Sequence, residues 1–404
     1  MPVGAETRRP IYVPSRTSIA DERDAEEKAT QKTEQERLKK KTEAREERIK
    51  SFGVATSKAP RDDFGELVLR RREVHSGRAM TVSTVEWSVA DKIATPTSAF
   101  EGFMWDKETE VDRFRERVPL SNLVSQCRLR ATDPSNPKPR DWFGPVKASA
   151  NDGSFVIIPE CKRMEPGTGS LRKRYDISRL TMEFTVAGVP AISVNCDGIL
   201  FGGTLDDVTK ARDAFKAATE SLPPGNGAIS SPPILASDLL LYPYQLYQLR
   251  LAGADAVNLM VAALEAKDLV YLAKIATSLQ MQTFVTVTST KQIEDLGILP
   301  TGSIKGLIVS NRNLEDFSFD LTGRQALDVL NSKAMKGFRE KHGDDNIAIL
   351  VEGRIGLVTG EEGTSPQDYI NKLKEAGAIG AIVGTGLVPD ESKKNPLATL
   401  LQAS

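Results

Sequence analysis

The fold is decided by the stretch Phe155-Val156-Ile157-Ile158-Pro159-Glu160-Cys161-Lys162-Arg163, an apolar run that ends in a carboxylate and an amine two positions apart. Side chains alternate between the two faces of a strand, so Glu160 and Lys162 are expected to point to the same side. The turn residues of Met164–Gly169 then end the strand. A charged pair at the end of a buried strand is costly unless its members pair with each other or take part in chemistry.

Beyond this stretch, apolar runs alternate regularly with amphipathic stretches. Strands are expected at residues 154–160, 190–195, 233–236, 255–261, 282–288, 305–310, 347–352 and 379–384. Helices are expected between them, among others at 205–220, 244–252, 265–279, 323–340 and 366–376. Eight such units over about 250 residues predict a (β/α)8 barrel, of the α/β class. A doubly wound open sheet is the alternative, but its Gly-rich fingerprint after the first strand is missing.

Two further regions precede the barrel, which we place at residues 151–404. Residues 1–60 form a charged arm, in which residues 21–50 carry ten acidic and ten basic side chains with no apolar stripe for a coiled coil. This arm is expected to be either disordered or partly helical. If it is partly helical, it could bind a partner. Residues 61–150 form an extension, in which the apolar spacing from Ala99 to Val124 predicts a helix that packs on the barrel.

Composition excludes several classes of function. The 54 basic and 55 acidic residues nearly cancel, so no overall field attracts nucleic acid. No apolar run approaches the roughly 18 residues that span a bilayer. The three cysteines, Cys127, Cys161 and Cys196, lie far apart, which argues against disulfides or a zinc site. We expect no metal and no cofactor, an inert Cys161 facing the helices, and surface positions for His75 and His342.

Several motifs, in the right order from about Thr95 onward, resemble indole-3-glycerol phosphate synthase, particularly its plant and algal branch. They are Pro159-Glu160-Cys161-Lys162-Arg163, Ala191-Ile192-Ser193-Val194-Asn195-Cys196-Asp197, Phe201-Gly202-Gly203-Thr204, Pro243-Tyr244-Gln245-Leu246-Tyr247, Ser310-Asn311-Arg312-Asn313-Leu314, Ser365-Pro366-Gln367-Asp368 and Ile382-Val383-Gly384-Thr385. The family is a carbon–carbon lyase of tryptophan biosynthesis, which closes an indole ring on a substrate that carries a carboxylate and a phosphate. The resemblance implies a TIM barrel and a phosphorylated small-molecule ligand.

The resemblance also implies which residues form the site. The retained catalytic positions are Glu160, Lys162, Arg312 and Glu352. The positions implied in binding substrate and phosphate are Phe201, Gly353, Arg354, Gly384 and Thr385. The alternative role of Arg312 is a structural ion pair with Glu352 or Glu160. The alternative role of Gly384-Thr385 is a tight turn between strand and helix.

Several family positions carry different residues in this chain. Ser237 stands at the third-strand lysine that is the family's general acid, and Thr286 stands at the fifth-strand glutamate. Leu239 replaces an aromatic residue that stacks on the substrate in the family. Ser310 replaces an asparagine, and Gly353-Arg354 replaces a Ser-Gly pair. Glu165 replaces a serine beside the anionic substrate, where it either repels that substrate or pairs with Arg354.

These departures favour a catalytically impaired barrel with a structural, scaffold or binding role and a protein partner for residues 1–60. The alternative is an active synthase with altered residues, and a weaker one is a sensor that binds a phosphorylated metabolite. Whether the chain is an enzyme is therefore open. A plastid location follows only by analogy with the plant and algal branch, with the cytoplasm as the other expectation.

Overall fold

The computed structural model describes residues 59–72, 89–90, 95–134, 136–151, 153–216, 231–353 and 366–388. Within these ranges, no helix is both long enough and apolar enough to cross a membrane. The predicted site residue Arg354, the predicted surface residue His75 and most of the proposed arm lie outside the described residues.

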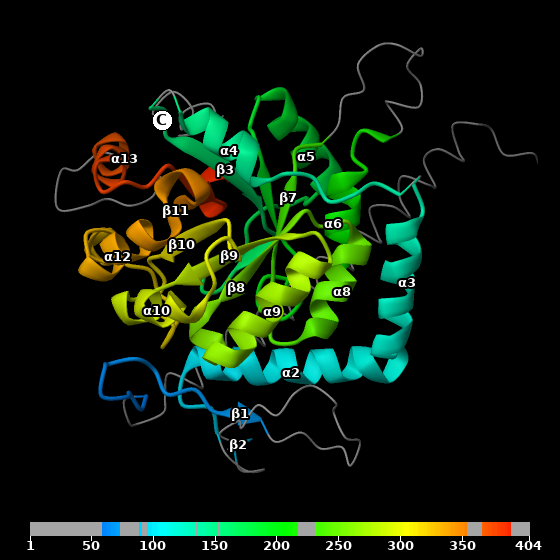
Figure 1. The fold of residues 1–404 in the computed structure, drawn as a ribbon, viewed down its shortest axis with the longest axis horizontal. Coiled ribbons are helices and arrows are strands. Elements are labelled where there is room, and N and C mark those ends of the chain that lie inside the picture. The colour runs from blue at the N-terminus through cyan, green and yellow to red at the C-terminus, as the bar shows by residue number, and fades with distance from the viewer. Residues whose placement is uncertain are drawn as a thin grey trace, which may run out of the picture. The chain divides into compact units, whose positions relative to one another are not determined.

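Eight parallel strands close into a barrel, which confirms the predicted fold (Figure 1). The strands are β3 (Val156–Cys161), β6 (Ile192–Asn195), β7 (Ile234–Ser237), β8 (Ala256–Met260), β9 (Gln282–Val287), β10 (Gly306–Ser310), β11 (Ala348–Glu352) and β12 (Gly380–Val383). The barrel closes where β12 pairs with β3, with Gly380 opposite Val156 and Val383 opposite Pro159. Each strand lies within about two residues of its predicted range.

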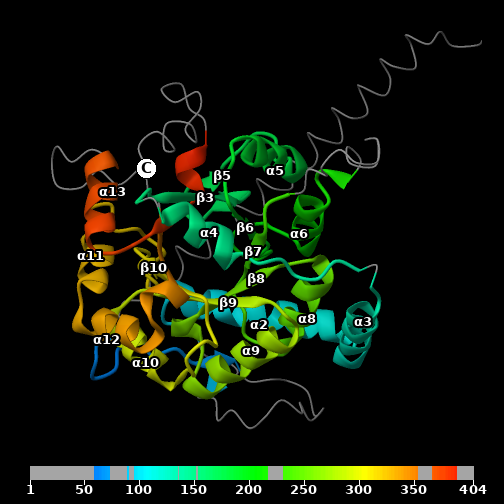
Figure 2. The same ribbon diagram turned by 45° about the horizontal axis from the view of Figure 1, so that its top comes forward.

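Helices surround the barrel on the outside (Figure 2). They are α5 (Ile177–Val186), α6 (Leu205–Arg212), α8 (Pro243–Ala252), α9 (Ala266–Ser278), α10 (Thr290–Asp295), α11 (Arg324–Leu330), α12 (Lys333–His342) and α13 (Pro366–Glu375). The single helix predicted at 323–340 is in fact α11 and α12. The break occurs because the Ser332 side chain caps α12 by accepting a hydrogen bond from the Met335 amide at 3.1 Å.

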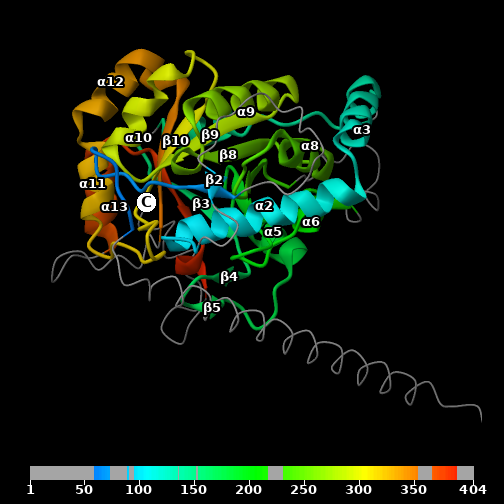
Figure 3. The same cartoon turned by 90° about the horizontal axis from the view of Figure 1, so that it is seen from below.

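The described part of the extension contains three helices, α2 (Ala99–Arg117), α3 (Leu120–Thr132) and α4 (Phe143–Ala150). The predicted single helix through Val124 is interrupted because Pro119 has no amide hydrogen to continue α2. Helix α2 lies across one end of the barrel (Figure 3), where Phe100 and Phe103 pack edge-to-face against Phe317. Residues of α2 thus pack against the loop after β10. The short strands β1 (Arg71–Arg72) and β2 (Val89–Ala90) pair in parallel.

Trp142 closes the amino-terminal end of the barrel. Its indole N–H donates to the carbonyl of Ile192 at 3.1 Å, and its ring meets Phe284 edge-on at 4.6 Å. The ring is fully buried together with interior residues of the barrel such as Ile158 and Leu350. Trp142 therefore ties the extension to the barrel core.

We predict that Trp142→Ala lowers the free energy of unfolding by about 3–5 kcal/mol, because it leaves a large cavity at the barrel end. Trp142→Phe is the matched control, since it keeps a six-membered aromatic ring and loses the indole N–H with a smaller part of the ring volume, for about 1–3 kcal/mol. Urea unfolding followed by circular dichroism measures both. Equal losses in the two variants would contradict the proposed role of the ring volume.

The prediction that His342 lies on the surface is wrong. His342 is 2% exposed, because its ring packs 4.5 Å from that of Phe338 at the end of α12. Within the described residues, neither ring nitrogen has a hydrogen-bond partner. Burial lowers the pKa of His342, and the charge of Lys341 adds to this.

We predict that acid weakens the fold through His342. Because its pKa is lower in the folded than in the unfolded chain, the unfolded chain takes up the proton first as the pH falls below about 6.5. The resulting slope of stability with pH is at most about 1.4 kcal/mol per pH unit. His342→Leu should flatten the slope between pH 5 and 7 (about one unit either side of the histidine pKa) in urea unfolding. An unchanged slope in this variant would refute the prediction.

Candidate functional site

The predicted site residues converge on one cavity of about 110 Å³ at the carboxyl ends of the barrel strands. Its lining includes every predicted site residue that the structure describes, namely Glu160, Lys162, Phe201, Arg312, Glu352, Gly353, Gly384 and Thr385. Ser237, Leu239 and Ser310, three of the departures from the family pattern, also line it. Phe100 and Phe103 of α2 complete the wall, so the extension helps to form the site.

Glu160 and Lys162 lie on the same side, as the alternation of the strand predicts, and form an ion pair at 2.8 Å. The side-chain amide of Asn195 donates to Glu160 at 3.3 Å. Gly384 passes so close that an added Cβ would lie 2.5 Å from a carboxylate oxygen of Glu160. The glycine thus makes room for the pair, and it directly precedes a 3-10 turn at Thr385–Leu387.

Glu165 is the most enclosed charge of the site, with a side chain that has no exposed surface. It lies in the short hairpin of β4 (Met164–Glu165) and β5 (Gly169–Ser170). One carboxylate oxygen accepts from the Lys162 ammonium at 2.7 Å and from the Thr385 hydroxyl at 2.8 Å, and the other pairs with Arg312. Burial opposes the charge, but Lys162 and Arg312 outweigh it and hold the pKa of Glu165 far below its usual range.

Arg312 does not form the predicted ion pair with Glu352 or Glu160; its carboxylate partner is Glu165. Its guanidinium also donates to the carbonyl of Phe317 at 3.3 Å. Three aromatic rings surround it, with centroids at 5.6, 5.8 and 4.1 Å for Phe201, Phe317 and Phe319. These rings direct the guanidinium toward the hairpin, because cations prefer the faces of aromatic rings.

Hydroxyl groups stand at the two positions where the resemblance implies an acid and a base. The Ser237 hydroxyl shares a hydrogen bond with that of Ser193 at 3.1 Å, and the Thr286 hydroxyl donates to the side-chain carbonyl of Asn258 at 2.9 Å. Thr286 is fully buried behind Asn258, which itself lines the cavity. Neither hydroxyl has an ionisable partner among these contacts that could activate it.

Glu352 is a further carboxylate of the cavity. Burial raises its pKa, and the negative charge of Glu160 raises it further, while Arg312 and a hydrogen bond with Ser310 act in the opposite direction. A carboxyl group in such surroundings is a candidate proton carrier.

A buried lysine on α2 holds this helix against the mouth of the barrel. This residue was not identified from the sequence. The ammonium of Lys107 lies 2.6 Å from Asp197, 2.8 Å from Asp238 and 2.6 Å from Glu110. Asp197 follows β6 and Asp238 follows β7, so the lysine ties two strand ends to α2. The aspartates at these two strand ends were the sequence feature that could have predicted the ion-pair cluster. Their partner Lys107, however, lies more than 80 residues away in sequence.

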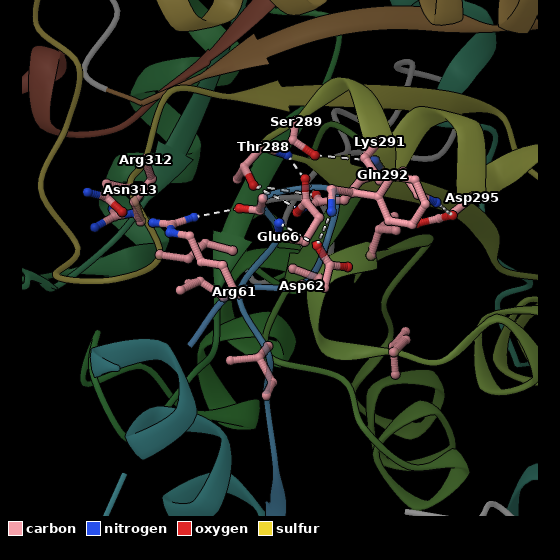
Figure 4. Close-up of a pocket in the computed structure, with 18 of the residues that line it drawn as sticks. Arg61, Asp62, Glu66, Thr288, Ser289, Lys291, Gln292, Asp295, Arg312 and Asn313 are labelled. Atoms are coloured by element: carbon pink, nitrogen blue, oxygen red, sulfur yellow. Dashed lines mark hydrogen bonds and ion pairs between the residues drawn. The ribbon is translucent and has the colours of Figure 1, made fainter. Parts of the chain in front are cut away.

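A larger cavity of about 850 Å³ lies beside the first, between the segment Arg61–Leu69 and the loops after β8, β9 and β10. Its cations are already paired, Arg61 with Glu315 and Lys291 with Asp295. The Gln292 amide spans the cavity wall to Glu66 at 2.8 Å (Figure 4). Arg312 lines both cavities, so it forms part of the wall between them. Within the described ranges, no group of three or more His, Cys, Asp or Glu side chains could hold a metal ion.

Fold and site together define a (β/α)8 barrel with an acid–cation pair at the carboxyl ends of its strands, the place where barrels of this class build their active sites. The family model for indole-3-glycerol phosphate synthase matches residues 100–336. The chain is 30% identical to an indole-3-glycerol phosphate synthase of Microcystis aeruginosa over 318 residues, which is 78% of this chain and 93% of that protein. This chain belongs to the indole-3-glycerol phosphate synthase family.

Further comparisons agree on the family. An indole-3-glycerol phosphate synthase of Trichodesmium erythraeum is 30% identical over 334 residues, 83% of this chain and 97% of that protein. A solved structure, orotidine 5'-monophosphate decarboxylase from Sulfolobus solfataricus, aligns at 15% identity and a TM-score of 0.37, covering 62% of this chain and 96% of that one. That structural likeness adds nothing to the assignment.

The cluster around Lys107 generates a prediction about pH. Burial raises the pKa of Asp238 to about 6, with Asp197 adding to the rise and Lys107 opposing it. Because this value lies above that of the unfolded chain, the contribution of Asp238 to stability is largest in acid and declines as the pH rises through 6. We expect the carboxyl carbon of Asp238 to titrate near pH 6 in an NMR experiment, well above the usual value of about 3.9.

Lys107→Met should move this midpoint upward and cost about 3–5 kcal/mol of stability, because it leaves buried carboxylates without their cation. Lys107→Arg, which keeps the charge, is the control. A midpoint near 4 in the unsubstituted protein would show that Asp238 is an ordinary ion-pair partner.

Proposed function

We propose that this barrel has lost most of the ring-closing activity of its family and serves as a structural, scaffold or binding protein that keeps part of an anion site. The observation that carries the proposal is the pair of hydroxyls at the acid and base positions. Ser237 and Thr286 hydrogen-bond to Ser193 and Asn258, and such groups neither donate a proton from a cation nor accept one as a carboxylate does.

The expected loss of rate is large. A positioned general acid or base contributes roughly 10²–10⁴ in rate. Losing both removes on the order of 10⁴ or more, even when their effects are not additive. The retained pair of Glu160 and Lys162 cannot replace them in the present arrangement, because the two groups neutralise each other at 2.8 Å.

The size of the cavity supports the same proposal. Sites for small molecules usually enclose about 300–1,000 Å³, whereas the cavity at the barrel mouth has a volume of about 110 Å³. Phe100 and Phe103 of α2 line it on one side, and Leu239 supplies no aromatic face for a ring. A substrate with an aromatic ring, a sugar-derived chain and a phosphate needs more room than this.

The active synthase is the competing function, and the names of the relatives favour it. Glu160, Lys162, Arg312 and Glu352 are retained, and the relatives from Microcystis aeruginosa and Trichodesmium erythraeum are named as synthases. Under this alternative, Glu352 with its raised pKa would serve as the proton carrier.

We further propose that residues 1–60 contact a protein partner and that the protein resides in a plastid. The balanced, dense charge of residues 21–50 supports the first proposal. Three arginines against one acidic residue in the first twenty residues support the second. Deletion of residues 1–60 should release the protein from a larger assembly in size-exclusion chromatography of a native extract.

We predict that the chain does not restore growth of a tryptophan auxotroph that lacks the synthase. In an assay of indole-ring formation, its rate should be lower than that of the Microcystis aeruginosa synthase by about 10⁴ or more, because both proton-transfer groups are missing. That synthase is the positive control, and immunoblotting shows equal expression. Growth at the control rate would overturn the proposed loss of activity and favour the competing function.

A further inference from the structure

Three donors from three separate strand ends converge on the Glu165 carboxylate. Lys162 follows β3, Arg312 follows β10 and Thr385 follows β12. They supply an ammonium at 2.7 Å, a guanidinium in direct contact and a hydroxyl at 2.8 Å. Two cations and a hydroxyl around one point are the donors that proteins use for a phosphate or carboxylate group.

The acceptor at that point belongs to the chain itself. The Glu165 side chain is fully enclosed, and both of its oxygens are engaged by these three donors. Lys162 and Arg312 also line the cavity at the barrel mouth, together with Thr385, whereas Glu165 does not. The donors therefore lie between the cavity and the glutamate, and they are turned toward the glutamate.

The hairpin that carries Glu165 fixes this arrangement. Glu165 pairs with Gly169 across the β4–β5 hairpin, and Gly167 at its turn has a φ of +76°, which favours glycine. The Met164 amide donates to the carbonyl of Phe201 at 3.2 Å, which attaches the hairpin to the loop after β6. The carboxylate is thus held in place by backbone contacts as well as by its charge.

We infer that Lys162, Arg312 and Thr385 form an oxyanion site of the phosphate-monoester class, and that Glu165 keeps it closed as an internal anion. This inference rests on the proposed function, because it explains how a barrel of this family retains its cations without a substrate. It adds that an external anion binds only when the Glu165 carboxylate is removed or displaced.

The test is the Glu165→Gln variant, which keeps the shape of the side chain and removes its charge. Lys162 then keeps only Glu160 as its counter-charge and Arg312 loses its carboxylate partner, so the variant should unfold at a lower temperature than the unsubstituted protein. Inorganic phosphate or glycerol 3-phosphate should restore the melting temperature in a saturable way, at ionic strength held constant with sodium chloride. Binding measured by calorimetry should be at least tenfold tighter than in the unsubstituted protein, since tenfold is the smallest change that stands clear of surface charge effects.

Glu101→Gln is the matched control. Glu101 is equally enclosed and pairs with Arg70 at 2.9 Å, but this partner, unlike Lys162 and Arg312, does not line the cavity. It should lower stability without creating saturable phosphate binding. Glu165→Gln combined with Lys162→Met restores the balance of charge and removes a donor, so this double variant should fold and lose the phosphate effect.

Each outcome decides the inference. Phosphate binding by Glu165→Gln that exceeds that of Glu101→Gln supports it, as does a Glu165→Gln protein that folds only in phosphate. Equal binding in both variants would overturn it. So would a Glu165→Gln protein that stays unfolded in phosphate while the double variant folds. A glycerol 3-phosphate affinity above that of inorganic phosphate identifies a monoester site, whereas the reverse order overturns that part of the inference.

The test of the closed anion site and the test of the proposed function can fail independently of each other. Growth of the tryptophan auxotroph with the unsubstituted chain would refute the loss of activity without touching the phosphate comparison. Equal phosphate binding in the variants would refute the closed site and leave the missing acid and base unchanged.

Discussion

Closure of the parallel sheet is the constraint on which the rest of the molecule depends. Pairing of β12 with β3 removes both free edges, and it needs Gly380, where an added Cβ would lie 2.4 Å from the carbonyl oxygen of Val156. Once closed, all eight strands end at the same mouth, so residues distant in sequence become neighbours, as Glu165 and Thr385 do across 220 positions. The site exists because the barrel is closed.

The same closure explains what the sequence could predict. Buried parallel strands read as continuous apolar runs, so their positions were predictable from short stretches. The shared face of Glu160 and Lys162 follows from strand alternation alone, and the ion pair at 2.8 Å agrees with it. The buried position of Cys161 on the opposite face, in the same hydrophobic cluster as Ile177 and Leu180 of α5, follows from the same alternation.

Side-chain partners across the barrel could not be predicted in this way. Arg312 pairs with Glu165, and the Phe201, Phe317 and Phe319 rings that surround its guanidinium come from loops far apart in sequence. Lys107 has no local partner in the sequence pattern beyond Glu110, because its aspartates lie on other elements. His342 reads as a surface residue in a charged segment, yet the turn of α12 places its ring on Phe338.

Charge balance at the mouth accounts for the burial of two cations there. A buried cation without a counter-charge costs several kcal/mol, so loss of an anionic substrate would penalise Lys162 and Arg312 at once. Glu160 and Glu165 supply two carboxylates for these two cations within ion-pair distance. Burial and the charge of Glu160 raise the pKa of Glu352, so this third carboxyl group adds less negative charge than a free one would. Lys162 and Arg312 are therefore balanced by carboxylates of the chain itself.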